Sequence, residues 1–292
     1  MSSREPRAWV FNLDAEDELA RGGAHTPSAA MLTRIESLVP KLRALLEPED
    51  EVLFPPRGAV RGLRGVAWCP TRWALTQMQR AGVVVPPAPS MEILRRVNHR
   101  QFSHELHQSL PVTAFVHTLE ALQAHLARTE ALAEVSTSRT WLLKRPLGFT
   151  GRGRKKLQTL SGVELAWVEA SLRTGDGLQV EPWVDRVLDC GLHGLLEPSG
   201  RCTFGRLTIQ QIDDTGAWNS TTLAPEGTLT PAELAALTTA ADRAAHALHT
   251  AGYFGPFGLD AYRWRAPDGA LHFQPQSEIN ARYSMGWAVG MR

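Results

Sequence analysis

The sequence of 292 residues predicts an α/β or α+β fold. Short apolar runs typical of strands alternate with segments whose apolar residues recur every three or four positions, as they do in amphipathic helices. The second half of the chain gives the clearer predictions, because it contains a helix with a full set of N-terminal capping residues and a hairpin-like pair of strands. No unit of about 20–50 residues repeats, so a solenoid is not expected.

Composition narrows the function classes before any motif is considered. The chain carries 31 Lys and Arg against 30 Asp and Glu, a net charge of +1 with His neutral, so bulk charge gives no case for nucleic acid or an anionic membrane. The hydrophobic share of 43% and the charged share of 21% are ordinary for a globular protein. The three cysteines, Cys69, Cys190 and Cys202, are widely spaced without a Cys-x-x-Cys pair, which argues against a disulfide framework and a zinc site.

The N-terminus and the hydropathy pattern predict a protein that is neither exported nor membrane-spanning. Residues 1–6 carry charge and proline where a signal peptide needs an apolar core. No stretch approaches the roughly 18 uninterrupted apolar residues of a membrane span. We therefore expect a cytoplasmic protein without a membrane partner.

Residues 1–90 are expected to form a small N-terminal α/β domain. A helical period covers residues 28–47, and Pro40 inside it should kink or split the helix. The domain ends in the proline-rich segment 86–90, which we take as a connection to the rest of the chain. Strand-like runs lie at residues 8–13, 51–54 and 83–85.

Residues 91–292 are expected to form a second, larger domain. Its best-marked helix begins with Thr230 as the cap, Pro231 in the first turn and Glu233 placed to close a capping box, and it stops before Gly252. Helical patterns cover residues 91–110, 119–133 and 230–251. Strand patterns cover residues 112–116, 140–144, 178–184, 191–196, 202–209, 257–264 and 271–280.

A basic, glycine-bearing loop follows the strand that ends at Lys144. Glycines let backbone N–H groups approach a phosphate closely, and cations neutralise its charge. The loop matches neither the Walker A pattern nor the Gly-x-Gly-x-x-Gly spacing, so a solvated basic turn and a nucleic-acid contact through residues 152–156 remain alternatives to phosphate binding. The loop residues suited to phosphate are Gly148, Thr150, Gly151 and Gly153.

Polar side chains gather on the last two predicted strands. Residues two apart on a strand face the same side, so Glu278, Asn280 and Arg282 share one face. Asp260 lies within the neighbouring strand, where Asp is a poor strand former, and can add a third oxygen donor to Glu278 and Asn280. Carboxylate and amide oxygens are the donors that Mg²⁺ takes. The alternatives are an ordinary polar strand face and an Asp260 paired with an arginine.

The third cluster is the strand end Glu181-Pro182-Trp183-Val184. Its backbone groups can form hydrogen bonds with the edge of a purine, and its apolar side chains can contact the face of the ring. A carboxylate that follows shortly in the sequence can bind a ribose. Asp185 and Asp189 both follow at short distance. Taken by itself, the segment is explained equally well by a structural strand end.

In their order along the chain, the three clusters resemble the ATP-grasp superfamily from residue 91 to the C-terminus. The most specific part of the resemblance is Glu278-Ile279-Asn280-Ala281-Arg282. The resemblance implies an ATP-grasp fold that follows a short N-terminal pre-ATP-grasp α/β domain of residues 1–90. It also implies a lid at about residues 112–182 and a C-terminal catalytic part at about residues 183–292.

The resemblance further implies a role for each cluster. Lys144 contacts nucleotide phosphates under the loop Gly148–Gly153, and ATP is held at its adenine by Glu181, Trp183 and Val184 and at its ribose by Asp189, with Asp185 as the competitor. The implied ligands of Mg²⁺, or of Mn²⁺, are Asp260, Glu278 and Asn280. Arg282 contacts phosphate or acyl phosphate, and with Lys144 it forms the expected catalytic pair.

The activity implied by the resemblance is ATP-dependent ligation. ATP activates a carboxylate as an acyl phosphate with release of ADP, and an amine then displaces phosphate. The expected partners are small-molecule or peptide carboxylates and amines, without nucleic acid, and a homodimer is left open. The alternative is a nucleotide-binding regulatory or scaffold protein that keeps the fold without turnover.

Overall fold

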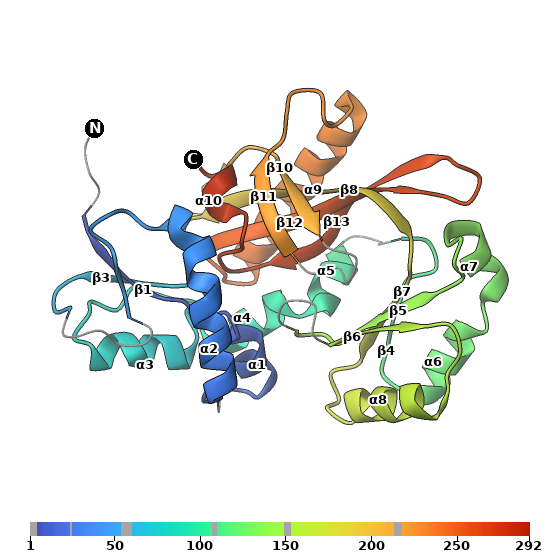
Figure 1. Cartoon of the computed structure of the whole chain (residues 1–292), viewed down its shortest axis with the longest axis horizontal. Coiled ribbons are helices and arrows are strands. Elements are labelled where there is room, and N and C mark those ends of the chain that lie inside the picture. Colours follow the sequence, from blue (N-terminus) through green and yellow to red (C-terminus); the bar gives the residue numbers. More distant parts are fainter. Residues whose placement is uncertain (1–4, 24, 54–59, 107–109, 149–152, 213–217) are drawn as a thin grey trace.

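The computed structural model describes residues 5–23, 25–53, 60–106, 110–148, 153–212 and 218–292. Within these residues the strands form three sheets (Figure 1). A parallel sheet near the N-terminus and a small antiparallel sheet lie at opposite ends of the molecule, and the large antiparallel sheet lies between them. None of the described helices combines the length and the apolar character that a bilayer crossing needs.

The N-terminal sheet has three parallel strands in the order β2-β1-β3. Its strands are β1 (Arg7–Val10), β2 (Glu51–Val52) and β3 (Arg64–Ala67), and the helices around it are α1 (Ala15–Ala20), α2 (Ala29–Leu38), the 3₁₀ helix η1 (Val39–Leu45) and α3 (Arg72–Arg80). The predicted split at Pro40 is confirmed, because α2 ends at Leu38 and Pro40 lies in the first turn of η1. The predicted strand at 83–85 is wrong: only Val84 makes a bridge, to Arg64, and Pro86 cannot donate a ladder hydrogen bond.

The small sheet has four antiparallel strands in the order β4-β7-β5-β6. Its elements are β4 (Ala114–Val116), α6 (Leu119–Leu126), α7 (Thr129–Val135), β5 (Trp141–Lys144), β6 (Arg154–Leu157), α8 (Gly162–Leu172) and β7 (Leu178–Pro182). The single helix predicted at 119–133 is two helices, because Arg128 between them has a non-helical backbone (φ −78°, ψ 51°). Helix α8 escaped prediction because its apolar residues have no clear helical period, and Val163 in it is exposed.

The large sheet runs in the order β11-β10-β8-β12-β13, with β9 also paired to β8. Its strands are β8 (Asp185–Leu196), β9 (Cys202–Phe204), β10 (Thr208–Ile212), β11 (Trp218–Leu223), β12 (Gly255–Arg265) and β13 (Leu271–Asn280). The one strand predicted at 202–209 is two, since the chain between them leaves the sheet to meet the C-terminal residues: Arg206 N–H donates to Gly290 O. The predicted hairpin of β12 and β13 is confirmed.

Helices cover the large sheet and complete its core. The capping box predicted for α9 (Pro231–Thr250) is present: Thr230 Oγ1 accepts from Glu233 N–H, and the Glu233 carboxylate accepts from Thr230 N–H. The other helices are α4 (Met91–Asn98) and α5 (Arg100–Leu106), both against β13, and α10 (Trp287–Gly290). The largest apolar cluster joins Trp9, Ile35, Leu237 and Phe257, so the N-terminal sheet and the large sheet share one core, while the small sheet packs a separate one around Trp141.

Candidate active site

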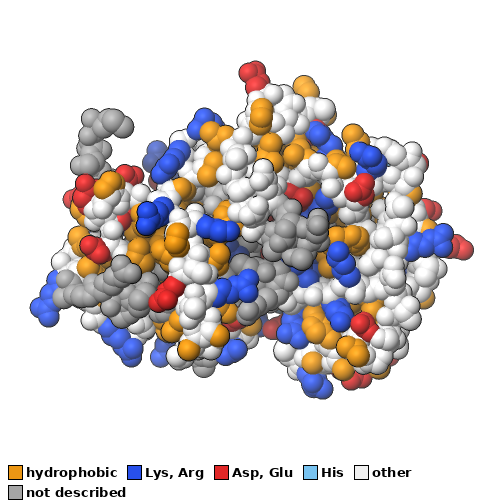
Figure 2. All heavy atoms as spheres, viewed as in Figure 1, with side chains coloured by type: hydrophobic (Ala, Val, Ile, Leu, Met, Phe, Trp, Pro, Cys, Tyr) orange, Lys and Arg blue, Asp and Glu red, His pale blue; other side chains and the backbone are white. Residues whose placement is uncertain are grey.

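A cavity of about 260 Å³ brings together residues of the basic glycine loop and of the last two strands, with Asp189 beside them. Its walls come from the large sheet, the end of β5, helices α2 and α5, and the segment that follows β13. Lys and Arg side chains lie on both sides of the boundary between the N-terminal part and the small sheet (Figure 2). The predicted site residues that line the cavity are Lys144, Gly148, Asp189, Asp260, Glu278, Asn280 and Arg282.

Strand pairing places the two acidic residues opposite each other. Asp260 on β12 faces Glu278 on β13, and Gly258 faces Asn280. The register shifts between Asp260 and Tyr262, where β13 carries Pro275. Because proline cannot donate to the ladder, it fits such an irregularity, and bulges of this kind re-aim side chains beside functional sites.

Asp260 is held by two amide donors. Its Oδ1 accepts from Gln210 Nε2 at 2.8 Å, and its Oδ2 accepts from Asn280 Nδ2 at 3.0 Å. Burial, and then the neighbouring Glu278 carboxylate, raise the pKa of Asp260 to about 6. A carboxylate that is costly to ionise beside another carboxylate is suited to a bound cation.

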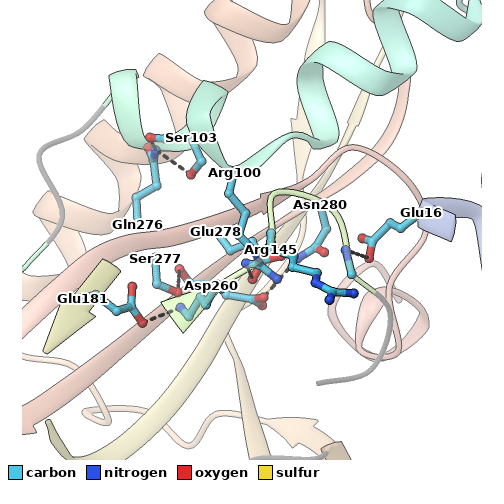
Figure 3. Close-up of polar contacts among 12 residues, drawn as sticks. Glu16, Arg100, Ser103, Arg145, Glu181, Asp260, Gln276, Ser277, Glu278 and Asn280 are labelled. Carbon is cyan, nitrogen blue, oxygen red and sulfur yellow. Dashed lines mark hydrogen bonds and ion pairs between the residues drawn. The ribbon is translucent and has the colours of Figure 1, made fainter. Parts of the chain in front are cut away.

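Glu278 pairs with Arg100, a residue to which no sequence motif assigns a role. Arg100 lies at the start of α5, is 9% exposed, and donates from Nε to the backbone oxygen of Arg145 at 3.0 Å. Burial favours the neutral form of Glu278, but Arg100 and Lys144 outweigh it and lower the pKa of this carboxyl. Figure 3 shows Arg100 reaching down to Glu278. Arg100 stands in a helical segment with other arginines, so no spacing singles it out.

Lys144 forms a buried ion pair with Glu181 on the neighbouring strand β7. Both side chains are about 5% exposed, and burial lowers the pKa of Lys144 against the opposing effect of Glu181. Lys144 lines the cavity, whereas Glu181 does not. The lysine and the proposed adenine segment are therefore linked directly by charge.

The other residues of the proposed adenine segment make structural contacts. Trp183 N–H donates to Thr140 O at 2.8 Å, and Trp183 O accepts from Ser136 Oγ at 2.6 Å. Val184 is buried in an apolar cluster with Tyr262. Neither Trp183 nor Val184 lines the cavity, and their contact with adenine stays a prediction.

The structure separates the two aspartates considered for the ribose. Asp189 lines the cavity and pairs with Arg186 at 3.1 Å, while Asp185 is exposed at the start of β8. The Arg186 guanidinium also lies 3.9 Å from the ring centroid of Tyr262. The geometry favours Asp189 over Asp185.

The glycine loop is described at its two ends. Gly148 lines the cavity, and Gly153 has φ +77° and accepts from Arg145 N–H at 2.8 Å. The positive φ favours glycine at this position, and an added Cβ would also lie 3.2 Å from the Arg145 side chain, which would have to shift slightly. Thr150 and Gly151 lie outside the described residues.

Positive charge is concentrated in the cavity, although the chain as a whole carries only +1. Among the described residues, six cations line it against the three carboxylates of Asp189, Asp260 and Glu278. Such an excess of cations fits a polyanion. The cations are Arg34, Arg100, Lys144, Arg154, Arg186 and Arg282.

The oxygen donors also fit a hard divalent cation. Asp260, Glu278 and Asn280 offer two carboxylates and one amide on adjacent strands, the donor chemistry that Mg²⁺ and Mn²⁺ accept. Within the described part of the chain no three His, Cys, Asp or Glu residues form a metal cluster, so a cation bound here would need the amide of Asn280 as its third donor.

A larger cavity, of about 610 Å³, lies elsewhere. It is lined by residues of the small sheet and of helices α6 and α7, with Trp141 and Leu157 in its wall. Arg139 is the one charged residue among the described residues that line it, and none of the predicted site residues does. We therefore place the active site in the smaller cavity.

Comparison with known proteins gives structural matches only. No protein-family model matches the sequence, and no curated protein matches it by sequence. Among solved structures, D-alanyl-alanine synthetase A from Vibrio cholerae has a TM-score of 0.58 at 10% identity, over 99% of this chain and 92% of that one. N5-carboxyaminoimidazole ribonucleotide synthetase from Thermus thermophilus has a TM-score of 0.53 at 18% identity, over 95% of this chain and 71% of that one.

A third match is the biotin carboxylase domain of 2-oxoglutarate carboxylase from Hydrogenobacter thermophilus, a dimer in complex with MgADP and bicarbonate. Its TM-score is 0.53 at 12% identity, over 99% of this chain and 71% of that one. Identities this low carry the fold and not the reaction. These three structures are ATP-grasp enzymes, and the chain has the ATP-grasp fold that its sequence predicts.

Proposed function

We propose that the protein is an ATP-dependent ligase that activates a carboxylate as an acyl phosphate, releases ADP and joins the acyl group to an amine. One observation carries the proposal: Lys144, Asp260, Glu278, Asn280 and Arg282, far apart in the sequence, line one cavity that is rich in cations. The ATP-grasp fold supports it, since the solved structures named above are two synthetases and a biotin carboxylase domain.

The nucleotide residues are assigned as follows in this proposal. Lys144 and the loop Gly148–Gly153 bind the phosphates, Glu181, Trp183 and Val184 bind the adenine, and Asp189 binds the ribose. Asp260, Glu278 and Asn280 hold Mg²⁺ or Mn²⁺. When bound, the cation screens the charge of the phosphates and stabilises the phosphoryl group during transfer.

The chain's own cations perform the remaining electrostatic task. A carboxylate and a triphosphate repel each other, and Lys144 and Arg282, both in the cavity wall, offset that repulsion where the phosphoryl group is transferred. Arg100 forms an ion pair with Glu278, which balances the charge of this carboxylate and favours its ionised form. Phosphoryl transfer of this kind needs no nucleophilic side chain.

The rest of the cavity wall is assigned to the acceptor substrates. Arg34 and Leu38 from α2, Trp218 from β11 and Met285 combine one cation with apolar surface. This combination suits an amino-acid or peptide carboxylate that has an apolar side chain.

The test measures Mg²⁺-dependent ADP release with pooled carboxylates and amines, followed by the single pair that gives turnover. We expect Asp260→Asn to lower ADP release at least tenfold, because a charged metal donor is replaced by a neutral amide. The matched control is Asp268→Asn, in the exposed turn of the same hairpin, which should leave the rate within twofold.

Two results would count against the ligase. Tight binding of ATP with Mg²⁺ but no ADP release with any pair would favour the regulatory or scaffold alternative. The absence of ATP binding, with Asp260→Asn indistinguishable from the wild type, would remove the nucleotide site altogether.

A further inference from the structure

Helix α1 in the N-terminal part carries a buried carboxylate, that of Glu16, which contacts residues of the active-site wall. Glu16 Oε1 accepts from Arg282 Nη2 at 2.6 Å and from Arg282 Nε at 3.2 Å, and Glu16 Oε2 accepts from Gly148 N–H at 3.2 Å. The Glu16 side chain is 6% exposed. One carboxylate thus holds both the arginine that follows β13 and the first residue of the glycine loop.

Glu16 contacts two residues of the cavity wall without lining the cavity itself. Arg282 and Gly148 line the cavity, but Glu16 does not. Figure 3 shows Glu16 extending from the blue N-terminal helix, on the side opposite Glu181. Glu16 is therefore placed to orient its two partners and not to bind the substrate itself.

The backbone around Arg282 is fixed independently of Glu16. Asn98 donates to Ala281 O at 3.3 Å and accepts from Ala281 N–H at 3.0 Å, and Tyr283 N–H donates to Trp68 O at 3.0 Å. The backbone contacts do not fix the long Arg282 side chain, which has many rotamers. Its guanidinium is held by Glu16 and by one hydrogen bond from Nη1 to Tyr283 O at 3.1 Å.

We infer that Glu16 is a positioning residue, which acts through Arg282 by holding its guanidinium in the cavity wall where the phosphoryl group is transferred. The inference rests on the ligase proposed above. It gives residues 1–90 a part in the reaction, because the charge that orients Arg282 comes from the N-terminal helix. Burial opposes the charge on Arg282, and Glu16 outweighs it and raises the pKa of the guanidinium.

A matched control lies two residues further along the same helix. Glu18 is as deeply buried as Glu16, but its Oε1 accepts from Trp73 N–H at 2.8 Å, away from the cavity wall. Glu18→Gln therefore reports what loss of a buried carboxylate does to the protein in general. Glu16→Gln reports the same loss together with the release of Arg282.

The kinetic test compares Glu16→Gln, Glu16→Ala and Glu18→Gln under conditions where each is folded. We expect both Glu16 variants to lower kcat by about 10- to 100-fold, the effect of a misplaced catalytic group, with the KM for ATP within threefold. Glu18→Gln should keep kcat within twofold. In an Arg282→Ala background, Glu16→Gln should cause no further loss, because it acts through Arg282. Unchanged kcat in Glu16→Gln, or the same loss in both backgrounds, would overturn the inference.

A second readout needs no turnover. The arginine Nε–Hε NMR signal of Arg282, identified by its absence in Arg282→Lys, should exchange slowly with water in the wild type and in Glu18→Gln. It should exchange at least tenfold faster in Glu16→Gln. An Arg282 signal that is unchanged in Glu16→Gln overturns the inference, whether or not the wild type releases ADP, whereas a wild type without ADP release overturns only the ligase.

Discussion

Charged side chains in and beside the cavity are held in ion pairs that the sequence alone could not assign. Lys144 with Glu181 is the most deeply buried of them, and both partners lie near 5% exposure. Removing one member of such a pair leaves an uncompensated charge, whereas replacing both with apolar groups restores packing. Stability and function can therefore be separated at this pair.

Lys144→Met should destabilise the protein by about 3–5 kcal/mol, because Glu181 is left buried without its cation. The double variant Lys144→Met/Glu181→Leu should recover most of that loss. Both variants should fail to bind ATP, since the phosphate-binding lysine is absent from each. Urea unfolding and ATP binding measure the two effects. Equal destabilisation of the single and double variants would show that the pair is not coupled.

His193 provides a pH-dependent contribution to stability. The side chain is 1% exposed on β8, and burial lowers its pKa to about 4. The unfolded chain, with a His pKa near 6.5, takes up the proton first, so stability falls as the pH drops from about 6.5 to 4, by at most about 3 kcal/mol. His193→Gln should lose this part of the pH dependence in urea unfolding between these pH values. His246→Gln, on the exposed side of α9, should retain the wild-type profile.

At the scale of elements, helix α9 shows how a local sequence signal is joined to the tertiary structure. Glu233 closes the capping box and also binds Arg263 on β12, at 2.7 Å to Nε and 2.6 Å to Nη2. The hydrogen bonds from Arg263 are the main reason that the pKa of Glu233 falls to about 2. A depressed carboxyl pKa stabilises the fold above pH 4.5, and that contribution is lost as the pH falls toward 2.

Thr230→Ala should cost about 1 kcal/mol in urea unfolding at neutral pH, because it removes the acceptor for Glu233 N–H. The same substitution in the exposed middle of the helix, Thr239→Ala, should instead stabilise the protein by about 0.5 kcal/mol, since Ala is the better helix former. Two effects of the same sign would contradict the capping account.

Elements with strong local signals were predictable, and those set by their surroundings were not. The capping box of α9 and the split at Pro40 depend on neighbouring residues only. The separation of β9 from β10 and the isolated bridge at Val84 depend on contacts elsewhere in the chain. The break between α6 and α7 lies in the non-helical backbone of Arg128, which no residue type at that position predicts. Helix α8 carries no clear period and gave no signal.

For the molecule as a whole, the proposed site predicts stabilisation by its ligand. A ligand that binds only the folded state at 100 times its Kd adds about 2.7 kcal/mol to the free energy of unfolding. ATP with Mg²⁺ should therefore raise the midpoint of thermal unfolding, and Asp260→Asn should abolish most of the rise. ATP with EDTA is the control for the cation. An unfolding midpoint of the wild type that does not change when ATP and Mg²⁺ are added would contradict the proposed nucleotide site.

Local order in the sequence determined the fold class, the capped helix, the hairpin of β12 and β13, and the chemical types of residue that a nucleotide site requires. Turn chemistry, periodicity and residue type act over a few neighbouring residues, so they can be predicted from a single sequence. The tertiary structure alone decided that Arg100 meets Glu278, that Lys144 is neutralised by Glu181, and that Glu16 reaches Arg282 across 266 positions of sequence. Such contacts depend on how separate elements pack, and a charge buried by that packing takes whichever partner the fold brings within reach.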